Sequence, residues 1–153
     1  MSALPRVALV YRAMTMADLE SVCAIEQRIY SFPWTRGNFV DSIHSGYFCT
    51  VAEYGGAIAG YGIFTAAAGE SHLLNLSIDE RWQRHGYGRA LLLHHVNLAR
   101  SLGASSLLLE VRPSNTAARA LYAAEGFEQI AVRHGYYPAG DAREDALLLR
   151  LPL

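Results

Sequence analysis

The segment from residue 72 to residue 111 constrains the fold more than any other part of this chain, because strand and helix patterns alternate in it. Residues 72–78 are typical of a strand, and residues 88–102 carry apolar side chains at helical spacing. Residues 107–111 follow as a short apolar strand, and Gly103 stands where a helix C-cap belongs. This order predicts a sheet whose strands are connected by helices.

The alternation continues to the end of the chain. Residues 114–125 predict another helix, which Gly126 would end. Residues 127–136 and 146–151 predict two further strands, joined by the turn-rich run Pro138-Ala139-Gly140-Asp141.

The first half predicts a strand near residues 7–11, two helices and a hairpin. Thr15 and Asp18 resemble a capping box ahead of a helical stripe that reaches Ile29, and Thr35 caps a second helix that ends at Ser45-Gly46. The hairpin joins strands at 47–53 and 57–64 through Tyr54-Gly55-Gly56. No repeat or linker interrupts the chain. We therefore expect one α/β domain over residues 1–153, a mixed central sheet flanked by helices.

Composition narrows the chemistry. The net charge is −1 and all thirteen basic residues are arginine, so a Walker phosphate loop and a Schiff-base lysine are excluded and no basic nucleic-acid surface is expected. Cys23 and Cys49 lack metal-ligand spacing, which favours simple thiols. No stretch approaches the ~20 apolar residues of a membrane span, and the N-terminus has no secretion signal. A cytoplasmic protein without a membrane partner is the expectation.

The glycine turn at residues 83–89 is the most informative motif. Gly86 and Gly88 stand between a strand and a helix, where backbone N–H groups and the helix dipole favour an anion. Arg84 and Arg89 flank the turn and would suit a phosphate or pyrophosphate. The alternative is a strand-to-helix turn whose glycines only allow close packing. A dinucleotide fingerprint is a poor match, because the third glycine is missing.

With this turn the chain resembles the GNAT acetyltransferases, whose pyrophosphate turn reads Gln/Arg-x-x-Gly-x-Gly/Ala, as residues 83–88 do. Within that family it is most similar to the RimI group, bacterial enzymes that acetylate the N-terminal alanine of small-subunit ribosomal protein 18. The motifs that carry the resemblance are Ile25-Glu26, Phe32-Pro33-Trp34, Leu74-Asn75, Gln83 to Arg89, Leu109-Glu110-Val111-Arg112, Ser114-Asn115, Leu121-Tyr122, Gly126-Phe127, Tyr136-Tyr137-Pro138 and Arg143-Glu144-Asp145-Ala146. The resemblance implies a GNAT fold, acetyl-CoA as co-substrate, no metal, and a ribosomal-protein N-terminus as partner.

The resemblance also implies roles for individual residues. An α-amine has a pKa of about 7.7–8.0, so most of it is protonated at pH 7 and a base is required. Glu110 is implied as the proton acceptor and Tyr122 as the proton donor to the leaving thiolate. On the residues alone, the favoured interpretation of Glu110 is an edge carboxylate paired with Arg112 or another arginine. That of Tyr122 is an ordinary core or rim tyrosine. The implied coenzyme-binding residues are Leu76, Ser77, Ile78, Arg84, His85, Gly86, Tyr87, Gly88, Arg89 and Asn115.

Several polar and aromatic residues remain open. Asn115 is alternatively a helix N-cap, a role that Ser114 could share. Glu26 interrupts an apolar stripe, which indicates either substrate contact or a solvated carboxylate. Trp34 and Tyr136-Tyr137 are either a lid over a peptide or buried aromatics. His85, His94 and His95 lack the spacing of a metal site.

Three classes of function are compatible with the turn. The first is an N-acetyltransferase, acting on a protein N-terminus or, as the runner-up, on a small-molecule amine. The second is a non-catalytic acyl-CoA-binding module, against which the presence of both Glu110 and Tyr122 argues. The third, a nucleotide-binding regulatory domain, lacks P-loop and dinucleotide marks.

Overall fold

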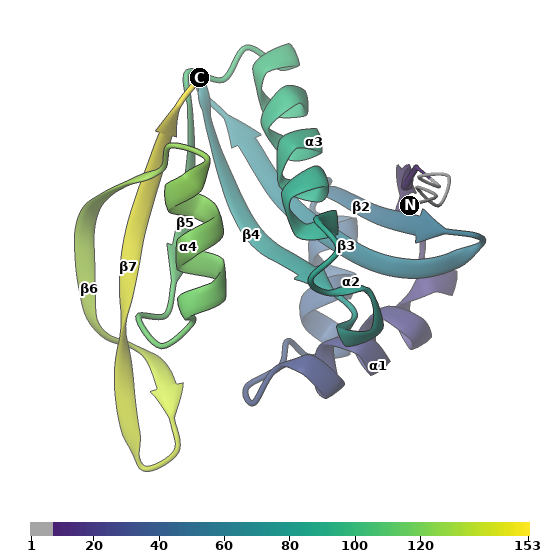
Figure 1. Ribbon diagram of the computed structural model, residues 1–153, viewed down its shortest axis with the longest axis horizontal. Helices are drawn as coiled ribbons and strands as arrows, with labels where there is room; N and C mark the ends of the chain where they lie inside the picture. The colour runs from purple at the N-terminus through teal and green to yellow at the C-terminus, as the bar shows by residue number, and fades with distance from the viewer. Residues whose placement is uncertain (1–7) are drawn as a thin grey trace, which may run out of the picture. The chain divides into compact units, whose positions relative to one another are not determined.

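The computed structural model describes residues 8–153, which fall into two compact units: residues up to 63 with 76–91, and residues 64–75 with 92–153. The elements in chain order are β1 Val10–Ala13, η1 Met16–Asp18, α1 Leu19–Ile29, α2 Arg36–His44, β2 Phe48–Tyr54, β3 Ala57–Ala67, β4 Glu70–Ile78, η2 Glu80–Trp82, α3 Tyr87–Ser101, β5 Ser106–Val111, α4 Thr116–Ala124, β6 Glu128–Ala139 and β7 Ala142–Pro152. The strands form one mixed sheet in the order β1-β2-β3-β4-β5-β7-β6 (Figure 1). The predicted α/β architecture is confirmed.

The helices of the first unit form where the sequence predicts them. In α1 the apolar residues Leu19, Val22 and Ile25 recur at helical spacing, and all three are buried. At the start of α2 the Thr35 hydroxyl accepts a hydrogen bond from the backbone N–H of Asn38 at 3.2 Å, while the Asn38 side chain accepts one from the N–H of Thr35. Such reciprocal capping contributes about 1 kcal/mol.

The core of the first unit lies on both faces of its strands. Side chains alternate along β2, so that Val51 joins one apolar cluster and Ala52 another. The first cluster is formed by Met14, Leu19, Val22, Ile25, Phe39, Cys49, Val51, Tyr61 and Ile63. The second consists of Ala52, Ile78 and Leu91. Both cysteines are free thiols, as predicted.

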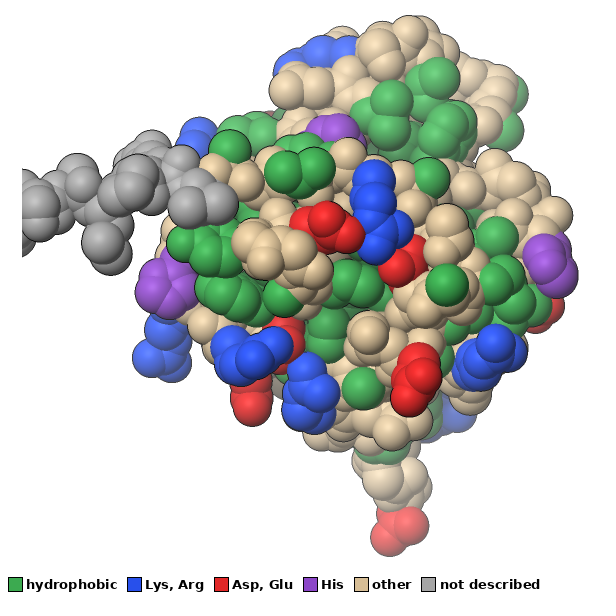
Figure 2. Space-filling model, turned by 90° about the vertical axis from the view of Figure 1, so that its right-hand side faces the viewer, with side chains coloured by type: hydrophobic (Ala, Val, Ile, Leu, Met, Phe, Trp, Pro, Cys, Tyr) green, Lys and Arg blue, Asp and Glu red, His purple; other side chains and the backbone are tan. Residues whose placement is uncertain are grey.

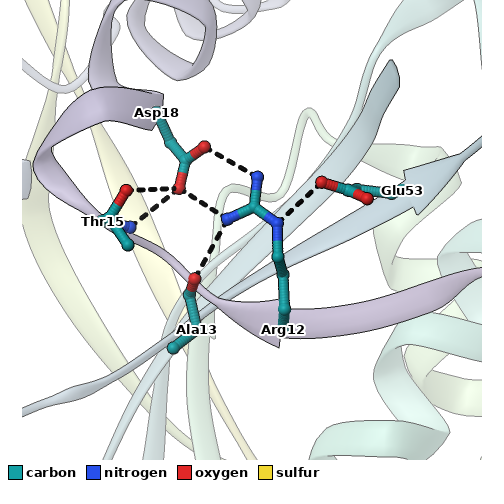
Figure 3. Close-up of polar contacts among 5 residues, drawn as sticks. All are labelled: Arg12, Ala13, Thr15, Asp18 and Glu53. Atoms are coloured by element: carbon teal, nitrogen blue, oxygen red, sulfur yellow. Dashed lines mark hydrogen bonds and ion pairs between the residues drawn. The ribbon is translucent and has the colours of Figure 1, made fainter. Parts of the chain in front are cut away.

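Strand β1, Val10–Ala13, begins and ends later than the predicted strand at residues 7–11. Its register places Val10 opposite Glu53 and Ala13 opposite Thr50. Residue 7 lies outside the described residues. From β1, Arg12 forms a charged cluster shown in Figure 3: its guanidinium binds Asp18 through two 2.8 Å hydrogen bonds and Glu53 through one of 2.6 Å. Asp18 also accepts from the N–H of Thr15, so the predicted capping box is present.

The second unit contains the parallel pair β4–β5 and the antiparallel pairs β5–β7 and β7–β6. Leu92, Val96 and Ala99 of α3 are buried, as their spacing predicts. The hydrogen-bonded pairs of β4 with β5 run from Glu70↔Ser106 to Leu73↔Leu109.

The β6–β7 hairpin, coloured green to yellow in Figure 1, is longer than the sequence predicts. The prediction that residues 138–141 form the turn is wrong in part, because Pro138 pairs with Arg143 and only Gly140 and Asp141 remain for the turn. Strand β6 is the sheet edge, where the missing N–H of a proline is tolerated.

A bulge in β6 explains why its continuation was missed. The register shifts between Arg133 and Tyr137, and Gly135 adopts a left-handed φ of 61°. Asp145 accepts a hydrogen bond from the N–H of Gly135, and Arg143 donates to the carbonyls of Gly135 and Tyr136. These polar residues of β7 therefore stabilise the bulge, although their composition resembles that of a loop.

On the face shown in Figure 2, arginine and acidic side chains are interspersed with hydrophobic ones. Among residues 8–153, no helix is long and apolar enough to cross a bilayer.

Candidate functional site

The glycine turn connects η2 to α3 in the first unit. Gly86 has a φ of 81° and Arg84 a φ of 65°, both in the left-handed region, and helix α3 begins at Tyr87. Gln83 donates a 2.9 Å hydrogen bond from its side chain to the carbonyl of Ile78, which fixes the turn to the end of β4. The first backbone N–H groups of a helix lack partners within the helix, so this turn can bind an anion.

Aromatic side chains pack beside the turn. The rings of Tyr54 and Trp82 are 4.6 Å apart, and that of Tyr87 lies 5.8 Å from Tyr54. His85 contacts Tyr87 with its ring centroid at 5.9 Å. Tyr87, which the resemblance implies as a coenzyme contact, therefore also has a packing role.

Asp79 lies just before the turn and anchors the end of β4 through its contacts. The sequence did not predict this role. Asp79 is 1% exposed and binds Arg28 of α1 at 3.0 Å, with Arg81 at 3.6 Å. Its backbone N–H donates to the carbonyl of Ala59. Its place at the end of an apolar strand is the signal that could have identified it, since buried carboxylates require charged partners.

The backbone of Leu76–Ile78 lies at the end of β4, beyond the last β5 pair at Leu73. Strand β3 approaches it closely: a Cβ added at Gly60 would lie 2.6 Å from the carbonyl oxygen of Ser77. Only glycine fits there, so this close packing fixes the position of the β4 backbone.

Glu26 lies in a buried polar network of the first unit and is only 1% exposed. Its carboxylate accepts hydrogen bonds from the Tyr61 hydroxyl at 2.9 Å and from the backbone N–H of Trp34 at 3.4 Å. Nearby, the hydroxyls of Tyr30 and Ser77 lie 2.6 Å apart. Burial is the main cause that raises the pKa of Tyr30 to about 12. Because Glu26 is buried and hydrogen-bonded inside the protein, the alternative of a solvated carboxylate is wrong.

Glu110 lies near the end of β5 in the second unit, with a side chain that is 11% exposed. Strand β5 lies between β4 and β7, so the alternative is wrong in placing Glu110 at an edge, but the arginine pairing that it predicts is present. Its Oε1 atom is 3.6 Å from Nε of Arg133 and 3.9 Å from Nε2 of His72. Tyr136, 44% exposed, also contacts it, and the pKa of Tyr136 is raised by burial first and by Glu110 second.

Arg112, the arginine nearest to Glu110 in sequence, is held elsewhere. It donates to the carbonyl of Pro138 at 2.8 Å, pairs with Glu144 at 3.3 Å and stacks over the ring of Tyr137 at 4.4 Å. Glu144 in turn accepts from the N–H and hydroxyl of Ser114. These contacts connect the β5–α4 turn to the β6–β7 hairpin. Neither Tyr136 nor Tyr137 is a fully buried aromatic.

The sequence did not predict that His72 and Arg133 lie beside Glu110. Each comes from a different strand, and neither belongs to a recognisable motif. Burial lowers the pKa of His72, and the nearby Glu110 opposes that effect. A histidine in an apolar strand is the one sequence signal that could have identified it.

Tyr122 and Asn115 belong to α4 and its start, also in the second unit. Tyr122 is 8% exposed and packs against Phe127 with ring centroids 5.5 Å apart. Asn115 is the N-cap of α4, because its side-chain oxygen accepts from the N–H of Ala118 at 3.2 Å. The N-cap alternative for Asn115 is thus confirmed, and its binding role stays a prediction.

The predicted site residues divide between the units. The first unit contains the turn and the Leu76–Ile78 backbone, and the second contains Glu110, Tyr122 and Asn115. Within the described part of the chain, no group of three or more His, Cys, Asp or Glu side chains is arranged to hold a metal ion.

Comparison with known proteins places these features in one family. The profile of the Acetyltransferase (GNAT) family matches residues 19–127. The chain is 38% identical over 141 residues to the [Ribosomal protein bS18]-alanine N-acetyltransferase of Escherichia coli strain K12, covering 92% of this chain and 95% of that protein.

Solved structures agree. The crystal structure of the ribosomal-protein-S18-alanine N-acetyltransferase from Escherichia coli superposes with a TM-score of 0.87 at 37% identity, covering 94% of this chain and 93% of that one. The crystal structure of Ard1 from Thermoplasma volcanium superposes with a TM-score of 0.84 at 27% identity, covering 96% and 99%.

Proposed function

Because the chain belongs to the GNAT family of acetyltransferases, we propose that it acetylates a protein N-terminus, namely the N-terminal alanine of small-subunit ribosomal protein 18. GNAT enzymes take the acetyl group from acetyl-CoA, and the chain is an N-acetyltransferase of this kind. The observation that carries the substrate proposal is 38% identity over 92% of the chain to an enzyme named for that reaction. The family match includes residues of both units, which supports a single domain over residues 1–153.

We assign the pyrophosphate of acetyl-CoA to the glycine turn. The left-handed φ angles of Arg84 and Gly86 and the start of α3 at Tyr87 support this assignment, because they leave backbone N–H groups available to an anion. Arg84, His85, Gly86, Tyr87, Gly88 and Arg89 are the proposed contacts. Leu76, Ser77 and Ile78 would bind the acyl arm through their backbone, and Asn115 would add a side-chain contact.

In the proposed reaction, Glu110 takes a proton from the substrate ammonium group. The freed amine nitrogen attacks the thioester carbonyl carbon, and the carbon–sulfur bond of the tetrahedral intermediate then breaks. Tyr122 donates its phenolic proton to the departing thiolate and is reprotonated as the acylated nitrogen loses its second proton, which leaves a neutral amide. The internal position of Glu110 in the sheet and its 11% exposure support its role, because a shielded carboxylate is available for directed proton transfer.

The first experiment uses a synthetic peptide that begins with the alanine of the ribosomal protein, incubated with acetyl-CoA and the enzyme. We expect mass spectrometry to show the addition of one acetyl group at the free α-amine. A peptide with a blocked N-terminus and a free lysine is the control. Acetylation of small amines but not of the peptide would overturn the substrate and leave the enzyme class intact, and absence of any product would favour a non-catalytic acyl-CoA-binding protein.

The catalytic roles have their own test. Glu110→Gln is expected to lower kcat by about 10²- to 10⁴-fold, the usual range for general acid–base catalysis. Tyr122→Phe is expected to lower turnover far more than the affinity for acetyl-CoA, measured by calorimetry. Equal losses of turnover and affinity would contradict the assignment of Tyr122 as the acid.

A further inference from the structure

The carboxylate of Glu110 has a histidine beside it that the proposed reaction does not yet use. Nε2 of His72 on β4 is 3.9 Å from Oε1 of Glu110 on β5. In the parallel ladder His72 lies opposite Leu108, two residues before Glu110, so both side chains project from the same face of the sheet. Regular strand geometry, and not a chance loop conformation, therefore holds this pair together.

Burial and charged groups of the neighbouring elements shift the pKa of His72. His72 faces Glu110 on β5, Arg133 on β6 and Glu70 on its own strand. Burial lowers the pKa of His72 most, Glu110 and Glu70 raise it, and Arg133 lowers it. Since free imidazole has a pKa of about 6.5, His72 is mainly neutral at pH 7 and can accept a proton.

Arg133 contacts the same oxygen of Glu110 from the other side. Its Nε atom is 3.6 Å from Oε1, and its side chain is 54% exposed. Glu110 is therefore flanked by a permanent cation on one side and a neutral base on the other.

We propose that His72 acts through Glu110 as its proton-relay residue: after Glu110 has taken a proton from the substrate ammonium, Nε2 of His72 receives that proton. This inference rests on the proposed role of Glu110. In the first transfer an N–H bond of the ammonium breaks and an O–H bond forms on Glu110. In the second that O–H bond breaks and an N–H bond forms on His72, which becomes imidazolium and loses the proton to water.

The relay requires that the neutral imidazole carries its proton on Nδ1. The side chain is 32% exposed, so water can reach the ring and remove the relayed proton. The 3.9 Å separation must close by about 1 Å to reach hydrogen-bond length, and catalytic hydrogen bonds commonly shorten in this way when substrate binds.

The order of ordinary pKa values explains why a second acceptor helps. A free carboxyl group has a pKa of about 4.3, imidazole about 6.5 and an α-amine about 7.7–8.0. Imidazole is therefore much closer to the amine in basicity, and a proton that rests on it is less easily returned. Proton transfer is most efficient when the acceptor pKa is near the working pH.

The test compares the pH dependence of kcat at saturating acetyl-CoA and peptide. His72→Gln keeps a polar side chain but cannot titrate. We expect it to lower the kcat plateau about tenfold and to move the acid limb of the profile to lower pH, with unchanged acetyl-CoA affinity and melting temperature. His94→Gln is the matched control, because His94 is also half-buried with a pKa lowered by burial, and its profile should equal that of the wild type.

A second measurement needs no variant. The titration of the His72 ring, followed by NMR in the wild-type protein, should have its midpoint below 6.5 and should coincide with the acid limb of kcat. A mismatch of more than about half a pH unit would overturn the relay, as would an unchanged profile in His72→Gln.

The outcomes separate this inference from the proposed function. If the wild type acetylates the peptide and His72→Gln behaves like the wild type, only the relay is refuted. A wild-type protein that forms no acetylated product refutes the proposed function, and the relay with it.

Discussion

Replacing Tyr61 by phenylalanine should reveal how much the buried Glu26 network contributes to stability. Tyr61 is fully buried and donates a 2.9 Å hydrogen bond to Oε1 of Glu26, which is 1% exposed. The substitution removes one hydroxyl and leaves the ring packing of Tyr61 against Phe39, at 5.8 Å, in place. A hydrogen bond to a charged group contributes about 1.5–3 kcal/mol. We therefore expect the free energy of unfolding to fall by about 2 kcal/mol, which for a chain of this size lowers Tm by roughly 4–8 °C.

The assay is urea denaturation followed by fluorescence, with thermal unfolding as a second probe. Tyr47→Phe is the matched control: Tyr47 is 40% exposed, so a change within about 0.5 kcal/mol is expected. In a Glu26→Gln background, Tyr61→Phe should cost only about 1 kcal/mol, because the acceptor is then neutral. Equal costs of Tyr61→Phe in the two backgrounds would refute the reasoning that a buried carboxylate is the partner.

Two further substitutions test the turn and the Arg12 cluster. The pKa of Asp18 is lowered to about 2, first by its hydrogen bond to Arg12. Its contribution to the free energy of unfolding is therefore present above about pH 4 and is lost as the pH falls from about 4 to about 2. Asp18→Asn should lower the free energy of unfolding by roughly 1–2 kcal/mol at pH 6 and by almost nothing at pH 2. The loss at pH 6 is smaller than the full pKa shift implies, because Arg12 is 38% exposed. A difference in urea midpoint that does not change with pH would contradict this. Arg84→Gly should stabilise the protein by about 1 kcal/mol, because Arg84 has a φ of 65°, while weakening coenzyme A binding by calorimetry. Unchanged affinity in that variant would argue against a phosphate contact by Arg84.

Local patterns in the sequence were sufficient for most elements. The stripe of α1, the Thr35 cap of α2 and the Gly55-Gly56 hairpin follow from interactions between residues only a few positions apart. The same is true of the turn at Gly86, where a left-handed backbone favours glycine. Such features depend on propensity and periodicity, and a sequence contains both.

The neighbours of Glu110 depended on the tertiary structure. Which strand lies beside β5, and therefore whether Glu110 is internal or at an edge, is decided by pairing between segments far apart in the chain. The bulge at Gly135 likewise depends on Asp145 and Arg143 of the opposite strand. Sequence patterns report the environment of one segment and not its partner. The sequence therefore left open whether Arg112 or another arginine pairs with Glu110, and the fold places Arg133 there.

The sequence alone thus determined the kinds of elements, the α/β class, the glycine turn before α3 and, by resemblance, the GNAT family. The tertiary structure decided the order of the strands, the burial of Glu26 and the placement of His72 and Arg133 around one carboxylate oxygen. The physical reason is range: helix stripes, caps and tight turns are fixed by neighbours along the chain, whereas strand order and charge contacts are fixed by the burial and pairing of the whole fold.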